Sequence, residues 1–319
     1  MNGQALPVVQ SRSWQAGQGV VLLGLVGLLV GLVTIPETAL RLLWYAFIPV
    51  VPAVLLVSPG LWRNLCPLAT LNVATGTRWG NRALSPQAAQ WAGAVGMLLL
   101  VVLIAARRVV LDTNGPVLMG LLVVVAVTAV AAGLLFDTKA GFCNAICPVL
   151  PVERLYGQLP WFEPPNPRCP TCTVCTRGGC LDLGPTKSVA QTLGPARKTN
   201  RWMLKPFGAF ALFFPGVVIG FFTVPEASMT SVVAVYGRVG LFAAISYGLG
   251  ALLVAGLRVR SEVAVGLLAV LAFGLYYWYA APAVATELGL PASVAAVIRV
   301  SALLLAAAWV VRFRRHVRA

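Results

Sequence analysis

The chain has 319 residues, of which 59% are hydrophobic and only 10% are charged, and its formal net charge is +15. Soluble domains contain about 25% charged residues. This composition therefore excludes an ordinary soluble protein and indicates a chain that lies in the lipid bilayer. The positive charge does not indicate binding to nucleic acid, because the basic residues lie mostly in connections between apolar segments. There they indicate how the chain is oriented in the membrane.

Eight apolar stretches follow one another along the chain, and each is close to the roughly 20 residues that cross a hydrocarbon core of about 30 Å. They predict an all-α fold, a polytopic membrane helical bundle of about eight spans. The sixth stretch is the weakest, since it is rich in glycine and begins beside Arg238. The expected spans lie near residues 18–35, 39–57, 88–106, 116–136, 206–224, 237–257, 263–281 and 293–311.

The longest polar connection divides the chain into three parts. Residues 1–136 are expected to form a first membrane half with a Cys-Pro turn at 66–67, and residues 206–319 a C-terminal membrane half. Between them, residues 137–205 are expected to form a small cysteine-rich insertion with a ferredoxin-like iron–sulfur segment.

The distribution of Lys and Arg predicts the orientation. Eight spans put both termini on one side, together with the connections 58–87, 137–205 and 258–262, and this side carries 19 of the 24 basic residues. Basic residues gather in cytoplasmic connections. We therefore expect a multi-pass protein of a bacterial inner (cytoplasmic) membrane, with both termini and the cysteine-rich insertion in the cytoplasm and the bilayer as its first partner.

A repeat is visible in the first two thirds of the chain. The segment Gly60–Leu68 aligns with Gly141–Val149 at a constant offset of 81 residues, and Gly76 and Gly157 match at the same offset. Each copy follows a pair of spans and contains a Cys-Pro step. The pattern predicts two helical hairpins, each ending in a Cys-Pro turn on the cytoplasmic side, that arose by duplication.

The strongest chemical signal is the run Cys169-Pro-Thr-Cys172-Thr-Val-Cys175-Thr-Arg-Gly-Gly-Cys180. Bacterial ferredoxins hold a cubane cluster with C-x2-C-x2-C-x3-C-P; here the last gap is four residues, and Leu181 replaces the proline. The run predicts a [4Fe-4S] cluster, with Cys180 either closing it or serving a second site. Tetrahedral zinc is the alternative, although zinc motifs usually separate two C-x2-C pairs by a dozen residues or more.

The second signal is Cys143-Asn-Ala-Ile-Cys147-Pro148, where positions four apart share one face of a helical turn. In the first copy Trp62 stands in place of Cys143, which leaves Cys66 alone before its proline. Because equivalent turns of a repeat meet near a common axis, Cys66, Cys143 and Cys147 are expected to lie close together. They are candidate ligands of a second metal site, a redox-active thiol group, or small buried residues.

The residue inventory limits the cofactors. Seven cysteines exclude two clusters with four protein thiolates each, and the single histidine, His316, excludes a bis-histidine haem b within the bundle. One [4Fe-4S] cluster is therefore expected, and a second iron–sulfur or other metal site stays open. The chain has no phosphate loop, dinucleotide fingerprint or flavin motif, so no catalytic residues are predicted.

Arg299, within the last span, is a candidate functional charge or snorkels to the interface.

With these motifs, the chain resembles the NapH/NosR/CcoG-type membrane ferredoxins over roughly residues 20–185. The matching pieces are Phe142–Pro148, the degenerate Trp62–Pro67 and the run Cys169–Cys180. The resemblance implies electron transfer between the quinone pool or cytoplasmic donors and a partner oxidoreductase or its metal site. The chain departs from the family in the lost cysteine at Trp62, in its single ferredoxin run and in four additional spans.

Three functions follow as hypotheses. The first is an electron-transfer subunit, rather than an autonomous enzyme, whose redox partner is a protein or a quinone. The second is a membrane thiol–disulfide protein that uses Cys66, Cys143 and Cys147. The third is a transporter or assembly scaffold in which the metal site is structural or acts as a sensor.

The topology can be tested with compartment-specific reporters. A reporter fused after Ala319 should report the cytoplasm, and one inserted near Asn114 should report the periplasm, because these positions flank an odd number of spans. The reverse pattern would contradict the assignment of the cysteines to the cytoplasm.

Overall fold

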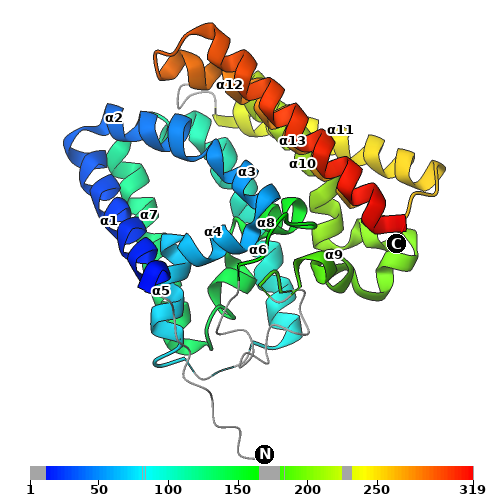
Figure 1. Ribbon diagram of the computed structural model, residues 1–319, viewed down its shortest axis with the longest axis horizontal. Coiled ribbons are helices and arrows are strands. Elements are labelled where there is room, and N and C mark those ends of the chain that lie inside the picture. The colour runs from blue at the N-terminus through cyan, green and yellow to red at the C-terminus, as the bar shows by residue number, and fades with distance from the viewer. Residues whose placement is uncertain are drawn as a thin grey trace, which may run out of the picture.

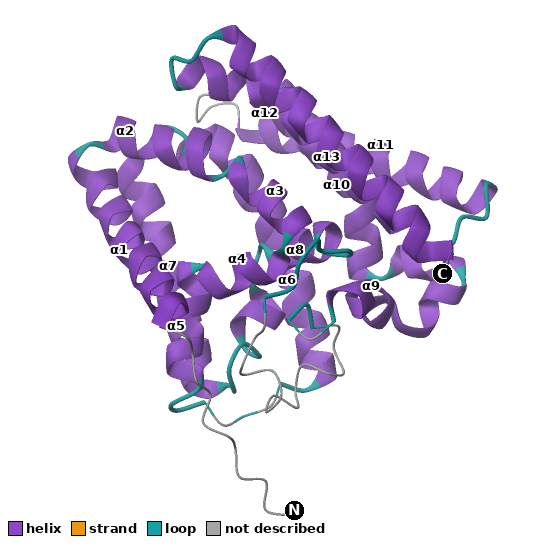
Figure 2. Cartoon of the chain, in the orientation of Figure 1, coloured by secondary structure: helices purple, strands orange, loops and turns teal. Residues whose placement is uncertain are grey.

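The computed structural model describes residues 12–80, 82, 84–164, 180–182, 184–224 and 232–318. Within these ranges the regular structure is entirely helical, apart from one isolated bridge between Arg82 and Phe136. Figure 2 shows the helices in purple and the connecting loops in teal. The all-helical part of the predicted fold class is confirmed. The ferredoxin-like insertion stays a prediction, because Cys169, Cys172 and Cys175 lie outside the described residues.

Within the described residues, eight helical stretches are long and apolar enough to cross a membrane, and they coincide in order with the eight predicted spans. The sixth begins at Val232, five residues before its predicted start, because the helix continues through the glycine-rich region. The spans are Arg12–Thr34, Pro36–Val57, Gln87–Leu111, Gly115–Leu135, Pro206–Thr223, Val232–Gly256, Ser261–Glu287 and Ala292–His316.

The first half contains two pairs of consecutive spans (Figure 1). In the first pair, α1 is followed by a broken span made of α2, the π-helix η1 and α3. In the second pair, α6, extended by the π-helix η2, is followed by α7. The predicted hairpins are open, because α7 packs against α5 (Pro67–Gly76) and α1 whereas α6 packs against η3 (Phe142–Ile146) and α10 (Pro206–Thr223). The bounds are Arg12–Thr34 for α1, Pro36–Arg41 for α2, Leu42–Phe47 for η1, Val50–Val57 for α3, Pro86–Ala106 for α6, Arg107–Leu111 for η2 and Gly115–Leu135 for α7.

The second half consists of α10 (Pro206–Thr223), α11 (Val232–Gly256), α12 (Ser261–Glu287) and α13 (Ala292–Arg318). Helix α10 lies at its centre and buries most of its length, from Phe207 to Phe221. Figure 1 shows α12 and α13 running side by side in opposite directions.

Both Cys-Pro steps have the same backbone conformation. Helix α4 (Pro59–Leu65) ends before Cys66, whose φ and ψ are −57° and 127°, and α5 (Pro67–Gly76) begins after it. The π-helix η3 (Phe142–Ile146) ends before Cys147, with φ and ψ of −56° and 122°, and α8 (Leu150–Tyr156) follows. Proline disfavours the α conformation in the residue before it. This rule accounts for the shared conformation of the two cysteines.

The two repeats pack against each other reciprocally. A Cβ atom on Gly76 would lie 2.7 Å from the carbonyl oxygen of Thr138, at the start of the second turn. A Cβ atom on Gly157 would lie 2.8 Å from a ring carbon of Pro59, at the start of the first turn. The matched glycines are thus needed for a close approach between the two repeats, and this approach brings the two Cys-Pro turns together.

The rest of the long connection packs onto the bundle. It contains α9 (Pro185–Leu193) and the 3-10 helices η6 (Gly194–Lys198) and η7 (Asn200–Leu204). Helix α8 lies between both halves: Leu155 and Tyr156 are buried, and the ring of Tyr156 stands edge-on to Phe273 of α12 at 5.9 Å. The described parts of this connection therefore form a cap on the membrane helices.

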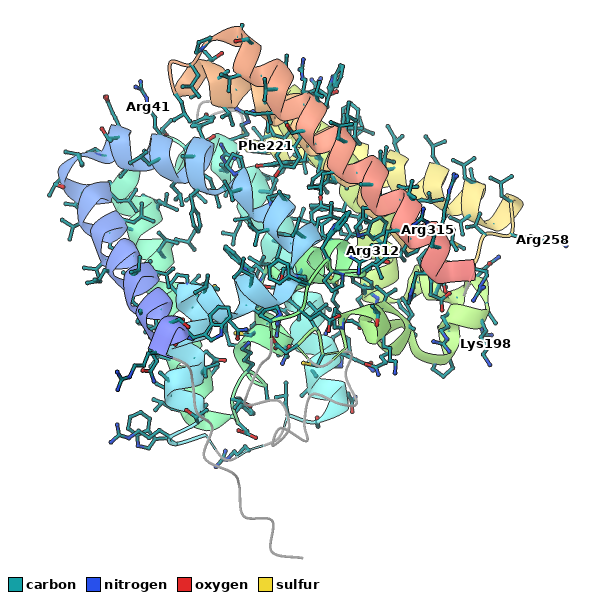
Figure 3. The ribbon with its side chains drawn as sticks, in the orientation of Figure 1. Arg41, Lys198, Phe221, Arg258, Arg312 and Arg315 are labelled. Carbon is teal, nitrogen blue, oxygen red and sulfur yellow. The ribbon has the colours of Figure 1, made fainter. Side chains whose placement is uncertain are left out.

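Contacts place the termini and the cysteine turns at one end of the bundle. Gln18, near the start of α1, donates to the Asn64 carbonyl beside the first turn, and Ser261, at the start of α12, donates to the Arg197 carbonyl. The Arg312 guanidinium, near the end of α13, stacks over the ring of Trp161 at 5.3 Å. Figure 3 labels Arg312 and Arg315 near the end of α13, well apart from Arg41 at the upper left. This arrangement is what an even number of spans requires.

Arg299 has a structural partner. Its Nε and Nη2 atoms donate to the carbonyl oxygen of Trp278 at 2.9 and 2.6 Å, and its guanidinium lies 4.4 Å from the centre of the Trp278 ring. In α12 this carbonyl would bond to the N–H four residues later, but that residue is Pro282, which has none. Arg299 therefore satisfies a carbonyl that the proline leaves free.

This role predicts a coupling between the two positions. Arg299→Met should cost about 1–2 kcal/mol in the free energy of unfolding, because a carbonyl within the membrane loses its charged donor. In a Pro282→Ala background the restored N–H should reduce that cost to a few tenths of a kcal/mol. A double-mutant cycle on unfolding in detergent measures the coupling, and equal costs in both backgrounds would contradict the role.

Candidate functional site

Four of the seven cysteines lie in the described residues. Cys143, Cys147 and Cys180 are buried, and Cys66 is half-buried. The other three candidate ligands, Cys169, Cys172 and Cys175, lie outside the described residues.

The cysteines of the two Cys-Pro turns share one apolar cluster. Cys143 and Cys147 are buried in it beside Leu181, and Cys66 packs against it. Leu181 directly follows Cys180, so the end of the ferredoxin-like run meets the same cluster. The expectation that Cys66, Cys143 and Cys147 lie close together is confirmed, and the residue after Cys180 packs in the same cluster.

A buried arginine lies at the centre of the site. Arg63, three residues before Cys66, is only 2% exposed. Its Nη1 donates to Oε2 of Glu153 in α8, and its Nη2 donates to Oδ1 of Asn144 in η3 at 2.6 Å. Its Nε and Nη2 donate to Oδ2 of Asp182 at 3.0 and 2.9 Å. One guanidinium therefore joins the first repeat, the second repeat and the segment that carries Cys180.

Asp182 has a second cation. Nζ of Lys139 donates to its Oδ1 at 3.0 Å, so both carboxylate oxygens are occupied. The Cys180 thiol also points at this carboxylate, with its Sγ 3.9 Å from Oδ2. Burial alone would raise the pKa of Asp182, but Arg63 and Lys139 outweigh it and hold the pKa well below its usual range. Asp182 is therefore ionised at neutral pH.

Arg154 lies beside this network. Burial lowers the pKa of Arg154 to about 10, and the neighbouring Arg63 adds to this effect, so Arg154 still carries its proton at pH 7. Arg63 and Lys139 are paired with the carboxylates of Glu153 and Asp182 in buried ion pairs, as charges taken out of water require.

The thiols at the turns are protonated in the metal-free protein. Burial raises the pKa of Cys66 to about 11 and that of Cys143 to about 12. Burial, followed by the charge of Glu153, also raises the pKa of Cys147. Cys143 has a polar neighbour in Asn72, whose Oδ1 lies 3.7 Å from its Sγ and whose amide donates to the Ala129 carbonyl.

The donor chemistry fits a thiolate-ligated metal group. The candidate donors are cysteine sulfurs, and soft thiolates select iron–sulfur clusters and zinc. Among the described residues, no group of three or more His, Cys, Asp or Glu side chains is arranged to hold a metal ion. The candidate ligands Cys169, Cys172 and Cys175 lie outside these residues.

The charge network is not predicted by the sequence. Arg63 and Lys139 lie in connections, where basic residues indicate topology, but both are buried in ion pairs. Two signals were available: Arg63 lies inside the first copy of the repeat, opposite Asn144 in the second, and Asp182 stands two residues after Cys180.

Comparisons of the chain with models of known families, with curated proteins and with solved structures found no match in any of the three. The resemblance to the membrane ferredoxins therefore stays a prediction, and the function is argued from the site alone.

The buried thiols predict a pH dependence. In chelator-treated protein, the alkylation rate of Cys66 should rise about tenfold per pH unit between about pH 8 and pH 10, because the thiolate is the reactive form and its pKa lies above that range. Peptide mass spectrometry gives the rate, and unfolded protein is the control. A plateau near pH 9, as for an exposed thiol with a pKa of about 8.5, would contradict the described burial.

Proposed function

We propose that this protein is a membrane-bound iron–sulfur electron-transfer protein of a bacterial inner membrane. It passes electrons between a cytoplasmic or quinone-linked donor and a partner oxidoreductase. The observation that supports this function best is the gathering of cysteines from three stretches of the chain at one end of the bundle. Leu181, directly after Cys180, packs in the same cluster as Cys66, Cys143 and Cys147, and Asp182 contacts both Cys180 and Arg63.

The ligands proposed for the cluster are Cys169, Cys172, Cys175 and Cys180. When bound, a [4Fe-4S] cluster supplies the capacity to accept and release one electron. The chain contributes the fixed end of the ligand run, since Asp182 is bound by Arg63 and Lys139. It also contributes apolar surroundings, because Leu181 and the turn cysteines exclude water from that end.

The buried cations support a negatively charged cofactor. A cubane ligated by four thiolates is an anion, and a buried anion needs nearby cations. Arg63 and Lys139 are buried and bind Asp182, two residues after Cys180, which suits this requirement. They also suit electron transfer, because each reduction adds one more negative charge.

Burial argues against the thiol–disulfide alternative. Exchange requires an accessible thiolate, whereas Cys143 and Cys147 are buried in an apolar cluster and their pKa values are raised. The turn cysteines therefore suit a packed or metal-ligating role better than attack on a substrate disulfide.

The proposal is tested by purification without oxygen. The protein should contain iron and acid-labile sulfide, show the broad visible absorption of thiolate–iron charge transfer, and give an EPR signal after reduction. Cys172→Ser should remove most of the absorption, and Thr173→Ser, next to it in the run, should not. Stoichiometric zinc without iron or sulfide would refute the cluster and favour a structural metal site.

A further inference from the structure

Exposed cations gather where η6, the connection between α11 and α12, and the end of α13 meet. The Ser261 hydroxyl donates to the Arg197 carbonyl at 3.1 Å, which holds η6 against the start of α12. A Cβ atom on Gly266 would lie 2.7 Å from the ring of Phe313, so the end of α13 lies beside the same helix start. The exposed cations of these three segments form the basic patch: Lys198, Arg258, Arg260, Arg314 and Arg315. Figure 3 labels Lys198, Arg258 and Arg315.

Almost no negative charge lies near the basic patch. The sequence has no acidic residue from 183 to 225 or from 288 to 319, and Glu262 is the only one from 227 to 286. The carboxylate of Glu262 lies 3.8 Å from Nε of Arg197, so an ion pair with a cation outside the patch already takes up its charge. The basic patch is therefore strongly positive, and its natural ligand is an anion.

Exposed leucines lead from the apolar part of α11 to the basic patch. Leu249, Leu253 and Leu257 follow one another at intervals of four residues, which places them on one face of the helix. They are 58%, 62% and 72% exposed, and Arg258 comes directly after them. An apolar stripe that ends at a cluster of cations matches a phospholipid, because the acyl chain is apolar and the headgroup carries a phosphate. A soluble acidic protein would match the cations alone.

The backbone of Arg258 has an unfavourable conformation. Its φ is 52°, in the left-handed region, and the N–H of Val259 bonds to the Val254 carbonyl at 3.1 Å. These are the features of a Schellman motif, in which glycine is the usual residue at the left-handed position. The end of α11 therefore does not explain an arginine here. Strain at a residue other than glycine points to a use of its side chain.

We propose that the basic patch binds the phosphate headgroup of an anionic phospholipid, with an acyl chain along the leucines of α11. Each basic residue at a membrane surface strengthens the attraction to anionic lipid about fivefold. The bound headgroup joins η6 to the connection between α11 and α12, and so holds the cap to the second half of the bundle. This inference goes beyond the proposed function and does not depend on a cofactor.

The affinity for phosphatidylglycerol tests the inference. The full chain in a neutral detergent is titrated with phosphatidylglycerol and, in parallel, with phosphatidylcholine of the same acyl chains, and bound lipid is counted by native mass spectrometry. The wild-type protein should bind phosphatidylglycerol more tightly. Inorganic phosphate at the same concentration should not displace the lipid, because it cannot occupy the leucines.

Variants separate the charge of Arg258 from its backbone. Arg258→Gly should weaken phosphatidylglycerol binding about fivefold, while its melting temperature without added lipid should equal or exceed that of wild type, since glycine relieves the left-handed conformation. Arg258→Lys keeps the charge and should retain the affinity. Lys198→Gln, on the other side of the patch, should also lose about fivefold. Arg78→Gln, an exposed arginine after α5, is the matched control and should bind as wild type does.

Losses in Arg258→Gly and Lys198→Gln without a loss in Arg78→Gln support the inference. Equal affinity for the two lipids, or an equal loss in Arg78→Gln, overturns it. Binding of polyglutamate that requires Lys198, with no preference for phosphatidylglycerol, also overturns it and assigns the basic patch to an acidic protein. None of these outcomes bears on the iron–sulfur cluster, so the proposed function stands or falls separately.

Discussion

The burial of the Arg63 guanidinium is the constraint on which the rest of the site depends. A charge with 2% exposure at the end of a membrane bundle must be surrounded by acceptors, and here they come from η3, from α8 and from the segment after Cys180. Removing one partner of such a group costs about 3–5 kcal/mol, although the intact pair adds little net stability. The network therefore serves the specificity of one arrangement more than its stability, and that arrangement keeps the cysteines together.

The repeat explains how the chain reaches this arrangement. Pro67 and Pro148 force the cysteine before each of them out of the helical conformation, so each span pair ends in the same turn. The matched glycines, Gly76 and Gly157, let each repeat approach the start of the other. Within this frame the two copies differ: Arg63 aligns with Asn144, and the two side chains bind each other. The matching turns thus set the geometry, and the difference between the copies places a charge at its centre.

The spans could be predicted from the sequence because length and apolar composition suffice to define them. The Cys-Pro turns could be predicted because proline acts on its immediate neighbour. The ion pairs of Arg63 and Lys139 could not, since a basic residue in a connection indicates topology until its partner in space is known. Arg299 shows the same limit. The Trp278 carbonyl that it binds lacks a partner within α12 only because Pro282 has no N–H to donate. Local rules therefore predicted the elements, and long-range pairing of charges decided the site.

The central claim is that an iron–sulfur cluster lies at the end of the bundle where Asp182 binds Arg63. An anomalous-difference map at the iron absorption edge, from crystals grown without oxygen, tests it most directly. The account predicts an iron peak bonded to Cys180, on the side of the bundle that carries the Cys66 and Cys147 turns. An iron peak elsewhere, or a peak at the zinc edge alone, would contradict it.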